Sequence, residues 1–424
     1  MTGPASAPAS AEQPVARLDP VPESFTAPRS HAVLDALAAA GGAARFVGGC
    51  VRNALIDRPA GDIDIATTLA PDAVVSALEA AGLRAVPTGI DHGTVTAVSG
   101  GVPYEITTLR RDVGTDGRHA TVAFTTDWAA DAARRDFTMN ALYADGEGRV
   151  FDPVGGGAGV ADARAGRVRF VGDPATRLAE DYLRLLRFFR FLAQYGRETP
   201  DATTLAALAE HVPGLARLSG ERLRQELVKL LAAPDPVRAW RLMAETGAAA
   251  AVIGEAGDIE RLAGLLVLEP APDWVRRLAA LMTEGPQAAR SRADRLRLSN
   301  AERDRLGALT TPAPEPLARD ADALALRRWL YRQGVATGRD RLLIELARAP
   351  DDDPRRSLVG DALAFEPPRL PVTGDDAIEL GAEPGPALGV ALRDVEDWWV
   401  ARDFAPDRAA CKLELARRLG IGDP

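Results

Sequence analysis

The pattern of apolar residues changes once along this 424-residue chain, at the glycine-rich segment 154–159. Before it, from about residue 31 to 153, stretches with helical spacing of apolar residues alternate with short stretches in which apolar and polar residues alternate. After it, Leu and Ala recur at three- and four-residue spacing to the end of the chain. The sequence therefore predicts an α+β fold, in which a mixed sheet with helices precedes an all-helical remainder.

This pattern divides the chain into segments 1–28, 29–155, 156–241 and 242–424. The first is rich in Ala, Pro and Ser and lacks apolar periodicity, so we expect a disordered tail. The second holds the mixed pattern, and the last two are helical. Residues 162–241 carry 14 Lys or Arg against 10 Asp or Glu, although the whole chain has a formal net charge of −9. We interpret that region as a local RNA-binding face; charges on the wet sides of ordinary helices explain it equally well.

Composition excludes several classes of protein. Cys50 and Cys411 lie too far apart in sequence to suggest a disulfide scaffold or a thiolate zinc cluster. The four histidines form no close pair, so we expect oxygen ligands for any metal. No apolar stretch reaches the roughly 18 residues of a membrane span, and the first residues lack the pattern of a secretion signal. We therefore expect a cytoplasmic protein.

Gly48 and Gly49 follow a strand-like stretch, and a helical pattern with Arg52 comes next. Glycines at such a turn allow backbone N–H groups to approach an anion closely, and Arg52 adds positive potential. We predict that a triphosphate binds at this turn, although most Gly-Gly pairs are only turns.

Asp62 and Asp64 alternate with Ile63 and Ile65 in an extended stretch. Residues two apart on a strand share one face, with Cα atoms about 6.6 Å apart, so the two carboxylates would point to the same side. Such carboxylates repel each other unless a cation lies between them, and Mg²⁺ prefers carboxylate oxygens. We predict that Asp62 and Asp64 are catalytic metal ligands; a solvated edge strand is the alternative.

Glu105 supplies a third acidic group, on a predicted strand in which Glu105 and Thr107 alternate with Ile106 and Thr108. If that strand pairs with the strand of Asp64, the carboxylates share one surface. Two metal ions held there would contact the attacking and leaving oxygens of a phosphoryl transfer. We therefore predict a nucleotidyl transfer centre in which Glu105 is the base.

Six segments occur in a fixed order that resembles one family. They are GGCVRNAL, GDIDIAT, YEITTLRRDVGTDGRHA, FTTDWAADAARRDFTMNALYAD, AEDYLRLLRFFRF and LSGERLRQELVKLL. Together, across about residues 30–240, they are similar to the class II tRNA nucleotidyltransferases, or CCA-adding enzymes, and the related bacterial poly(A) polymerases. The resemblance implies a head of the DNA polymerase beta superfamily, then a helical neck, body and tail that bind tRNA. It implies Mg²⁺-dependent addition of C, C and A to the 3′ end of tRNA from CTP and ATP, with release of diphosphate.

The resemblance assigns roles to two further pairs. Asp136 and Asn140, four apart and expected on one helical face, suit ribose hydroxyls. Asp181 and Arg184, expected three apart on one helix, offer an acceptor and a donor that match the Watson–Crick edges of cytosine and adenine. A surface salt bridge between Asp181 and Arg184 is the alternative. The complete set of predicted nucleotide-binding residues is Gly48, Gly49, Arg52, Arg110, Arg135, Asp136, Asn140, Asp181, Arg184 and Arg187.

The remaining motif residues receive weaker interpretations. Arg134 and Arg135 either meet phosphate or pair with neighbouring acids. Residues 112–119 are predicted to form a mobile loop, which in the family helps the change from C to A addition. Residues 221–226 are expected to give structural support. Asn53 stands where the family usually carries Asp, so it keeps an acceptor without the charge.

Two other functions stay open. One is a poly(A) polymerase, which is disfavoured because the stretch after the Asp64 strand has only Arg84 as a basic residue. The other is a catalytically silent tRNA-binding module, which the intact acidic residues disfavour. An added phosphohydrolase domain is not expected, because the helical remainder has no adjacent His-Asp pair.

Overall fold

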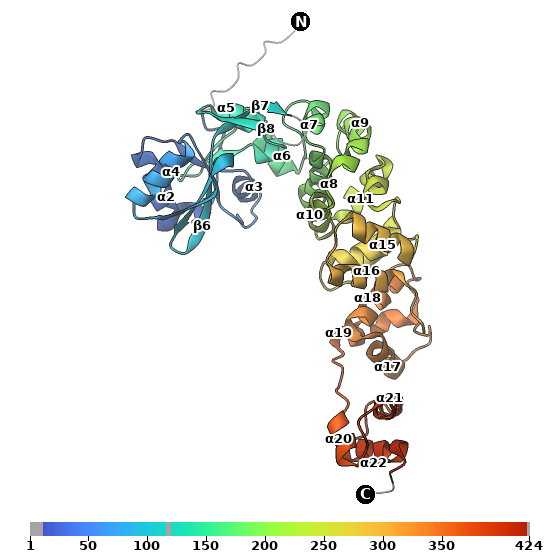
Figure 1. The fold of residues 1–424 in the computed structure, drawn as a ribbon. Coiled ribbons are helices and arrows are strands. Elements are labelled where there is room, and N and C mark those ends of the chain that lie inside the picture. The colour runs from blue at the N-terminus through green and yellow to red at the C-terminus, as the bar shows by residue number, and fades with distance from the viewer. Residues whose placement is uncertain (1–11, 116–119, 422–424) are drawn as a thin grey trace. The chain divides into compact units, whose positions relative to one another are not determined.

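The computed structural model describes residues 12–115 and 120–421, and the chain divides into two compact units, Met1–Ala256 and Gly257–Pro424. The first unit combines a mixed sheet with helices, and the second is helical in its described part (Figure 1). The α+β prediction is confirmed. The predicted division at residues 155 and 241 is finer than these two units, and it stays a prediction.

Within the described residues, eight strands form the main sheet, in the order β1-β10-β9-β2-β3-β6-β5-β4. Their bounds are Ala16–Arg17 (β1), Arg149–Phe151 (β10), Tyr143–Ala144 (β9), Ala44–Val47 (β2), Asp64–Thr67 (β3), Val102–Thr108 (β6), Thr94–Ser99 (β5) and Arg84–Gly89 (β4). Strands β3 and β6 pair in parallel, and the other neighbours are antiparallel.

The alternation read from the sequence sets the two faces of this sheet. Ile65 of β3 and Tyr104 and Ile106 of β6 are buried, whereas Glu105 is exposed on the opposite side of its strand. Helices α2 (Pro28–Ala39) and α4 (Pro71–Ala80) lie side by side against the sheet (Figure 1). The apolar face of the central strands is thereby covered, and the face that carries the acidic residues is left for chemistry.

Residues 12–28 are ordered, so the predicted disordered tail is wrong for the part that the structure describes. Strand β1 extends the sheet, and Phe25 of α1 (Glu23–Thr26) is fully buried, with its ring stacked 4.0 Å from that of Phe46. The sequence signal failed because two or three anchoring apolar residues give no periodicity. Residues 1–11 lie outside the described residues.

The predicted loop 112–119 is also partly wrong. Residues 112–115 belong to β7 (Arg110–Thr115), which pairs with β8 (Ala120–Phe124) in a separate two-stranded sheet. Residues 116–119 lie outside the described residues. Helix α5 (Trp128–Ala133) follows β8.

Seven helices complete the described part of the first unit. They are α6 (Ala158–Ala165), α7 (Pro174–Glu180), α8 (Leu183–Tyr195), α9 (Ala202–His211), α10 (Gly220–Leu231), α11 (Pro236–Glu245) and α12 (Ala248–Ile253). Helix α8 packs against α10 and α11, and its Phe188 stacks on Phe170 with ring centroids 5.5 Å apart. Capping oxygens such as those of Asp201 and Ser219 accept N–H groups in the first turns of α9 and α10.

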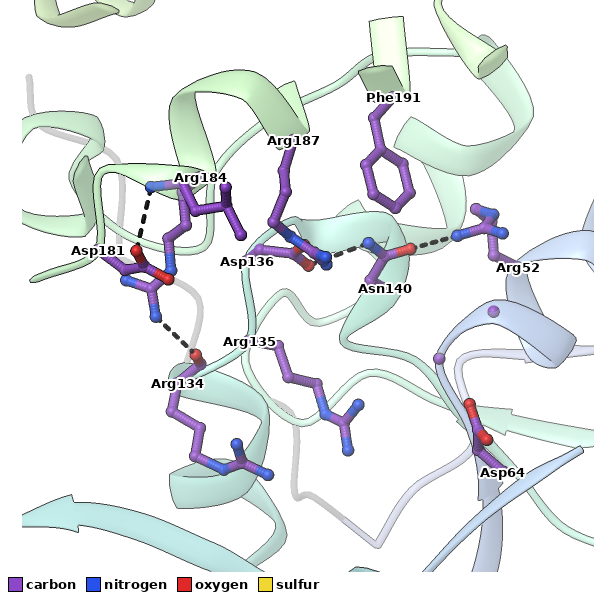
Figure 2. A pocket seen from close by; sticks show the side chains of 13 residues that line it. Arg52, Asp64, Arg134, Arg135, Asp136, Asn140, Asp181, Arg184, Arg187 and Phe191 are labelled. Atoms are coloured by element: carbon purple, nitrogen blue, oxygen red, sulfur yellow. Dashed lines mark hydrogen bonds and ion pairs between the residues drawn. The ribbon is translucent and has the colours of Figure 1, made fainter. Parts of the chain in front are cut away.

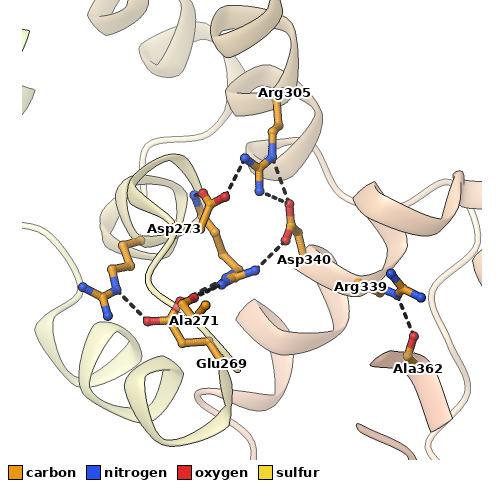
Figure 3. Close-up of polar contacts among 9 residues, drawn as sticks. Glu269, Ala271, Asp273, Arg305, Arg339, Asp340 and Ala362 are labelled. Atoms are coloured by element: carbon orange, nitrogen blue, oxygen red, sulfur yellow. Dashed lines mark hydrogen bonds and ion pairs between the residues drawn. The ribbon is translucent and has the colours of Figure 1, made fainter. Parts of the chain in front are cut away.

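The described part of the second unit contains ten helices. They are α13 (Ile259–Leu268), α14 (Trp274–Leu281), α15 (Pro286–Arg295), α16 (Asn300–Thr310), α17 (Ala323–Gln333), α18 (Val335–Leu346), α19 (Val359–Ala364), α20 (Gly374–Glu379), α21 (Pro386–Ala401) and α22 (Arg408–Leu419). A network of ion pairs joins α14, α16 and α18. Arg276 binds Glu269 at 2.8 Å and Asp340 at 3.0 Å. Arg305 binds the other oxygen of Asp340 at 2.6 Å (Figure 3). None of the helices in the described residues is long and apolar enough to cross a membrane.

Candidate active site

A polar cavity of about 450 Å³ lies in the first unit, between the head sheet and helix α8 (Figure 2). The residues that line it are Gly48, Gly49, Arg52, Asp64, Arg134, Arg135, Asp136, Asn140, Asp181, Leu183, Arg184, Arg187 and Phe191. The cavity therefore brings together most of the residues that the sequence motifs single out.

The Gly48–Gly49 turn joins β2 to α3 (Gly49–Leu55) at the cavity wall. Gly48 has φ 73°, a conformation that favours glycine, and its N–H donates to the carbonyl of Leu142 at 3.0 Å. A Cβ on Gly48 would lie 3.6 Å from Arg135, and one on Gly49 3.7 Å from Arg52. The two glycines thus keep the space beside two guanidinium groups open.

Arg52 is held at the cavity by neutral groups. Its Nη1 donates to Asn140 at 2.5 Å, its Nη2 donates to the Tyr195 hydroxyl at 2.7 Å, and Asn53 Oδ1 accepts from it at 2.8 Å. Burial lowers the pKa of Arg52, and no carboxylate pairs with it in the described part of the chain. Its charge therefore stays available to an anion.

Asn53 has a structural role at the position where the family usually carries Asp. Its Oδ1 accepts from Arg52, and its Nδ2 donates to the carbonyl of Pro59 at 2.9 Å. The donor to Pro59 is one that a carboxylate lacks.

Asp64 and Glu105 are register partners on the parallel strands β3 and β6, and Asp62 precedes β3 as an exposed residue. Burial raises the pKa of Asp64 to about 6, with further raising by Glu105 and Asp62 and lowering by Arg135. Glu105 and Asp62 thus lie close enough to Asp64 to disfavour its charged form, although β3 begins at Asp64 rather than before Asp62. In the described residues no group of three or more acidic, His or Cys side chains forms a metal cage.

Asp131 of α5 organises the two arginines of the next motif. Its carboxylate pairs with Arg134 at 2.7 Å and Arg135 at 2.9 Å, and it accepts a hydrogen bond from the Tyr143 hydroxyl at 2.7 Å. Burial alone would raise the pKa of Asp131, but Arg135, Arg134 and the hydrogen bonds lower it to about 2. Asp131 is not among the residues predicted from the sequence, although its spacing of three and four residues from the arginines was a usable signal.

Asp136 and Asn140 do lie together, but not on an α-helix as predicted. The chain is irregular at Asp136 and forms a 3-10 turn at Thr138–Asn140. Asn140 Nδ2 donates to Asp136 at 3.0 Å, and Arg187 Nε donates to the other oxygen of Asp136 at 2.9 Å. With the bond from Arg52 to Asn140, these contacts form a continuous row from α3 to α8 (Figure 2).

Asp181 and Arg184 are not on one helix either. Asp181 lies between α7 and α8 in an extended conformation, and it accepts from the N–H of Leu183 at 3.0 Å. Its partner is Arg222 of α10, at 2.9 Å and 3.1 Å, whereas Arg184 pairs with Glu180. The alternative of a salt bridge between Asp181 and Arg184 is therefore wrong.

Three predicted site residues do not line the cavity. Asp62 and Glu105 are exposed residues beside Asp64, and Arg110 donates from Nη1 to the carbonyl of His92 at 2.7 Å. Phe191 and Leu183 line the cavity but were missed. Phe191 could have been found from its position four residues after Arg187 on one helical face.

Comparison with known proteins assigns the fold and the site to a class. The model of the "Poly A polymerase head domain" matches residues 44–169, and the model of the "Probable RNA and SrmB- binding site of polymerase A" matches residues 199–256. The catalytic part is therefore a nucleotidyltransferase head of the poly(A) polymerase type.

Individual relatives show which family within this class the chain resembles. The mitochondrial CCA tRNA nucleotidyltransferase 1 of Danio rerio is 35% identical over 370 residues, which cover 84% of this chain and 83% of that protein. The CCA-adding enzyme of Geobacillus stearothermophilus is 34% identical over 369 residues, 82% of this chain and 86% of that protein. The crystal structure of the Bacillus stearothermophilus CCA-adding enzyme in complex with CTP matches with a TM-score of 0.70 at 30% identity, over 92% of this chain and 96% of that chain. This chain belongs to the family of CCA-adding tRNA nucleotidyltransferases.

Proposed function

We propose that this protein adds C, C and A to the 3′ end of tRNA, using CTP and ATP and releasing diphosphate. The observation that carries the proposal is that one cavity brings together Asp64 of β3, the guanidinium groups of Arg52 and Arg135, and the pair Asp181 and Arg184. This arrangement offers a reacting end, a phosphate-binding wall and a base-reading end within one nucleotide-sized space.

Asp62 and Asp64 would hold Mg²⁺. They fit this ion because Asp64 is a partly buried carboxylate whose pKa is raised by burial and by two nearby acids, so a cation there would relieve the repulsion. Two carboxylates are enough for this ion, because Mg²⁺ is usually bound by one or two carboxylates together with substrate phosphates. When bound, the ion would neutralise charge on the phosphoryl group that is transferred.

Glu105 is the proposed base for the attacking 3′-hydroxyl of the tRNA. It is exposed, and it projects from the same face as Asp64, its partner in the register. An exposed carboxylate at that point is open to a large substrate. Accepting the hydroxyl proton would leave the oxygen free to attack the α-phosphorus of the nucleotide, with diphosphate as the leaving group.

Base selection is assigned to Asp181 and Arg184. Cytosine and adenine each present an amino donor beside a ring-nitrogen acceptor, which Asp181 can accept from and Arg184 can donate to. Guanine and uracil present the opposite pattern, and they would leave buried polar groups unmatched at a cost of about 1–3 kcal/mol each. In the structure Arg222 holds Asp181 and Glu180 holds Arg184, so both groups are oriented before a nucleotide arrives.

The test is incorporation of labelled CTP and ATP into tRNA that lacks its 3′ end, in the presence of Mg²⁺. Addition of C, C and A is expected. Long adenylate tails on generic RNA with ATP alone would instead indicate a poly(A) polymerase, and tRNA binding without any incorporation would indicate a catalytically silent module. A cytoplasmic location remains a prediction of the sequence, because the relative from Danio rerio is named as a mitochondrial protein.

A further inference from the structure

The glycine-rich segment 154–159 has no role in the chemistry described so far. It leads from β10 into α6, and the N–H groups of Gly155, Gly157 and Gly159 donate to the carboxylate of Asp152 at 2.8 Å, 3.0 Å and 2.8 Å. Asp152 is buried, and no cation pairs with it in the described part of the chain. These bonds hold the start of α6 against the end of β10.

Gly159 allows α6 to approach the turn that carries Asn140. A Cβ at Gly159 would lie 2.6 Å from the backbone carbonyl oxygen of Thr138, so this close approach requires glycine. Thr138 is the first residue of the 3-10 turn η2 (Thr138–Asn140). The glycine-rich segment therefore places α6 directly against η2.

A buried carboxylate of α6 binds the same turn. Asp162 Oδ2 accepts a hydrogen bond from the hydroxyl of Thr138 at 2.7 Å, and the side chain of Asp162 is fully buried. Asp162 Oδ1 accepts from Arg167 at 2.9 Å and from Arg169 at 2.6 Å. The N–H of Thr138 donates to the carbonyl of Arg169 at 2.9 Å. Because the two arginines occupy Oδ1, the other oxygen of Asp162 is held toward Thr138.

The other end of η2 presents Asn140 to the cavity. Asn140 Oδ1 accepts from Arg52 at 2.5 Å, and its Nδ2 donates to Asp136 at 3.0 Å, so the two contacts fix the direction of the amide (Figure 2). They use one lone pair of the oxygen and one of the two amide hydrogens. The remaining lone pair and hydrogen match a hydroxyl group, which both donates and accepts.

We propose that Thr138 and Asp162 determine the sugar preference of the site, because they hold Asn140 where it meets the 2′-hydroxyl of the nucleotide. Both are positioning residues, since neither is among the residues that line the cavity. A displacement of η2 by about 1 Å would be enough to weaken such a contact strongly. The inference rests on the proposed function, because it takes the cavity as the site of CTP and ATP.

The experiment compares the addition of CTP and dCTP to tRNA that lacks its 3′ end, as the ratio of the two kcat/KM values. Thr138→Val removes the hydroxyl at nearly constant shape, and Thr138→Ser keeps it. We expect Thr138→Val to lower the ratio roughly 3- to 10-fold, because dCTP lacks the hydroxyl that Asn140 would meet. Thr138→Ser should stay near the wild-type ratio. The affinity for tRNA should be unchanged in both variants.

Asp162→Ala removes the other partner of the same hydrogen bond. In the double variant Thr138→Val/Asp162→Ala the ratio should fall no further than in the more affected single variant, because both changes break one contact. A fall equal to the product of the two single effects would show that the residues act independently, contrary to this inference. If Asp162→Ala does not fold, the comparison of Thr138→Val with Thr138→Ser decides the question.

Thr204→Val is the matched control. Thr204 is buried in α9, and its hydroxyl donates to Asp201 at 3.0 Å, so this variant loses a bond of the same kind outside the cavity. It should lower the melting temperature and leave the ratio of CTP to dCTP addition unchanged.

Three results would overturn the inference while leaving the proposed function standing. The first is a Thr138→Val protein that, like the control, changes only in melting temperature. The second is an equal ratio in Thr138→Ser and Thr138→Val, since the hydroxyl would then have no part. The third is a wild-type protein that adds CTP and dCTP equally well. If the wild type adds no nucleotide to tRNA, the proposed function fails as well.

Discussion

Asp64 and Glu105 face each other across the one parallel strand pair of the described head sheet, as register partners on β3 and β6. Their side chains therefore project from the same face, and Glu105 and Asp62 raise the pKa of Asp64 beyond the effect of burial. Two strands separated by more than thirty residues of sequence are thus needed to assemble one acidic site.

Replacing either acid should stop catalysis without unfolding the head. We expect Asp64→Asn and Glu105→Gln each to lower kcat by roughly 10²–10⁴, because the proposed metal ligand or the proposed general base would be lost. Single-turnover incorporation of CTP measures the effect. Glu79→Gln, an exposed acid on α4, is the control and should be unchanged. A folded Asp64→Asn protein with wild-type kcat would refute the metal assignment.

Arg52 should act on nucleotide binding rather than on tRNA binding. Arg52→Gln removes the charge that Asn53, Asn140 and Tyr195 orient but do not neutralise. We expect the KM for CTP to rise at least about tenfold, since a charge-assisted contact to phosphate contributes about 1.5–3 kcal/mol. The KM for tRNA serves as the internal control. An equal rise in both constants would indicate that the variant has disturbed the whole head.

Arg222 should influence base selection through Asp181. Removing the acceptor in Asp181→Ala should lower the preference for CTP over UTP, measured as a ratio of kcat/KM, by roughly 5- to 150-fold. Arg222→Met should lower the same ratio by a smaller factor, and Arg222→Lys should restore part of it, because a cation beside Asp181 is kept. If Arg222→Met changes only the melting temperature, the contact is structural.

The stability of the head should depend on Asp131 in acid. The pKa of Asp131 is about 2 in the folded protein against an ordinary value of 3.8, so the stabilisation is complete above 3.8 and is lost as the pH falls toward 2. This corresponds to about 2 kcal/mol. Urea unfolding should therefore show a larger deficit for Asp131→Asn at pH 7 than at pH 2.5. Glu147→Gln, from an exposed ion pair with Arg149, should show little difference. A deficit that is equal at both pH values would contradict the assignment.

Local patterns predicted those parts of the site that depend on strand alternation and glycine turns. Ile65 and Ile106 enter the core as the period of two requires, and Gly48 adopts the backbone conformation that favours glycine. Spacing rules failed at Asp136 and Asp181, because both precede a helical turn rather than lie within a helix. The sequence alone did not show that Arg222, forty-one residues further on, is the partner of Asp181.

Arg110 shows a second limit. Its place in a motif suggested a nucleotide contact, but its guanidinium is bound to a backbone carbonyl near η1 (Ile90–His92). Asp131 and Phe191 were missed although each lies at helical spacing from an arginine of the site, because spacing alone does not show which of several neighbours meet in the folded protein. For Arg110 as for these two residues, the contacts in the folded protein, and not local propensities, decide where the side chain lies.

Because Phe25 stacks on Phe46, the segment before the first motif supports a strand that leads into the active site. Phe46 is two residues ahead of Gly48, so the short strand β2 carries a core anchor and leads directly into the glycine turn at the cavity wall. Removal of the first 28 residues would expose one face of that strand to water. The shortened protein would then lose activity because the cavity wall at Gly48 and Gly49 is no longer held in place, even though every motif residue is retained.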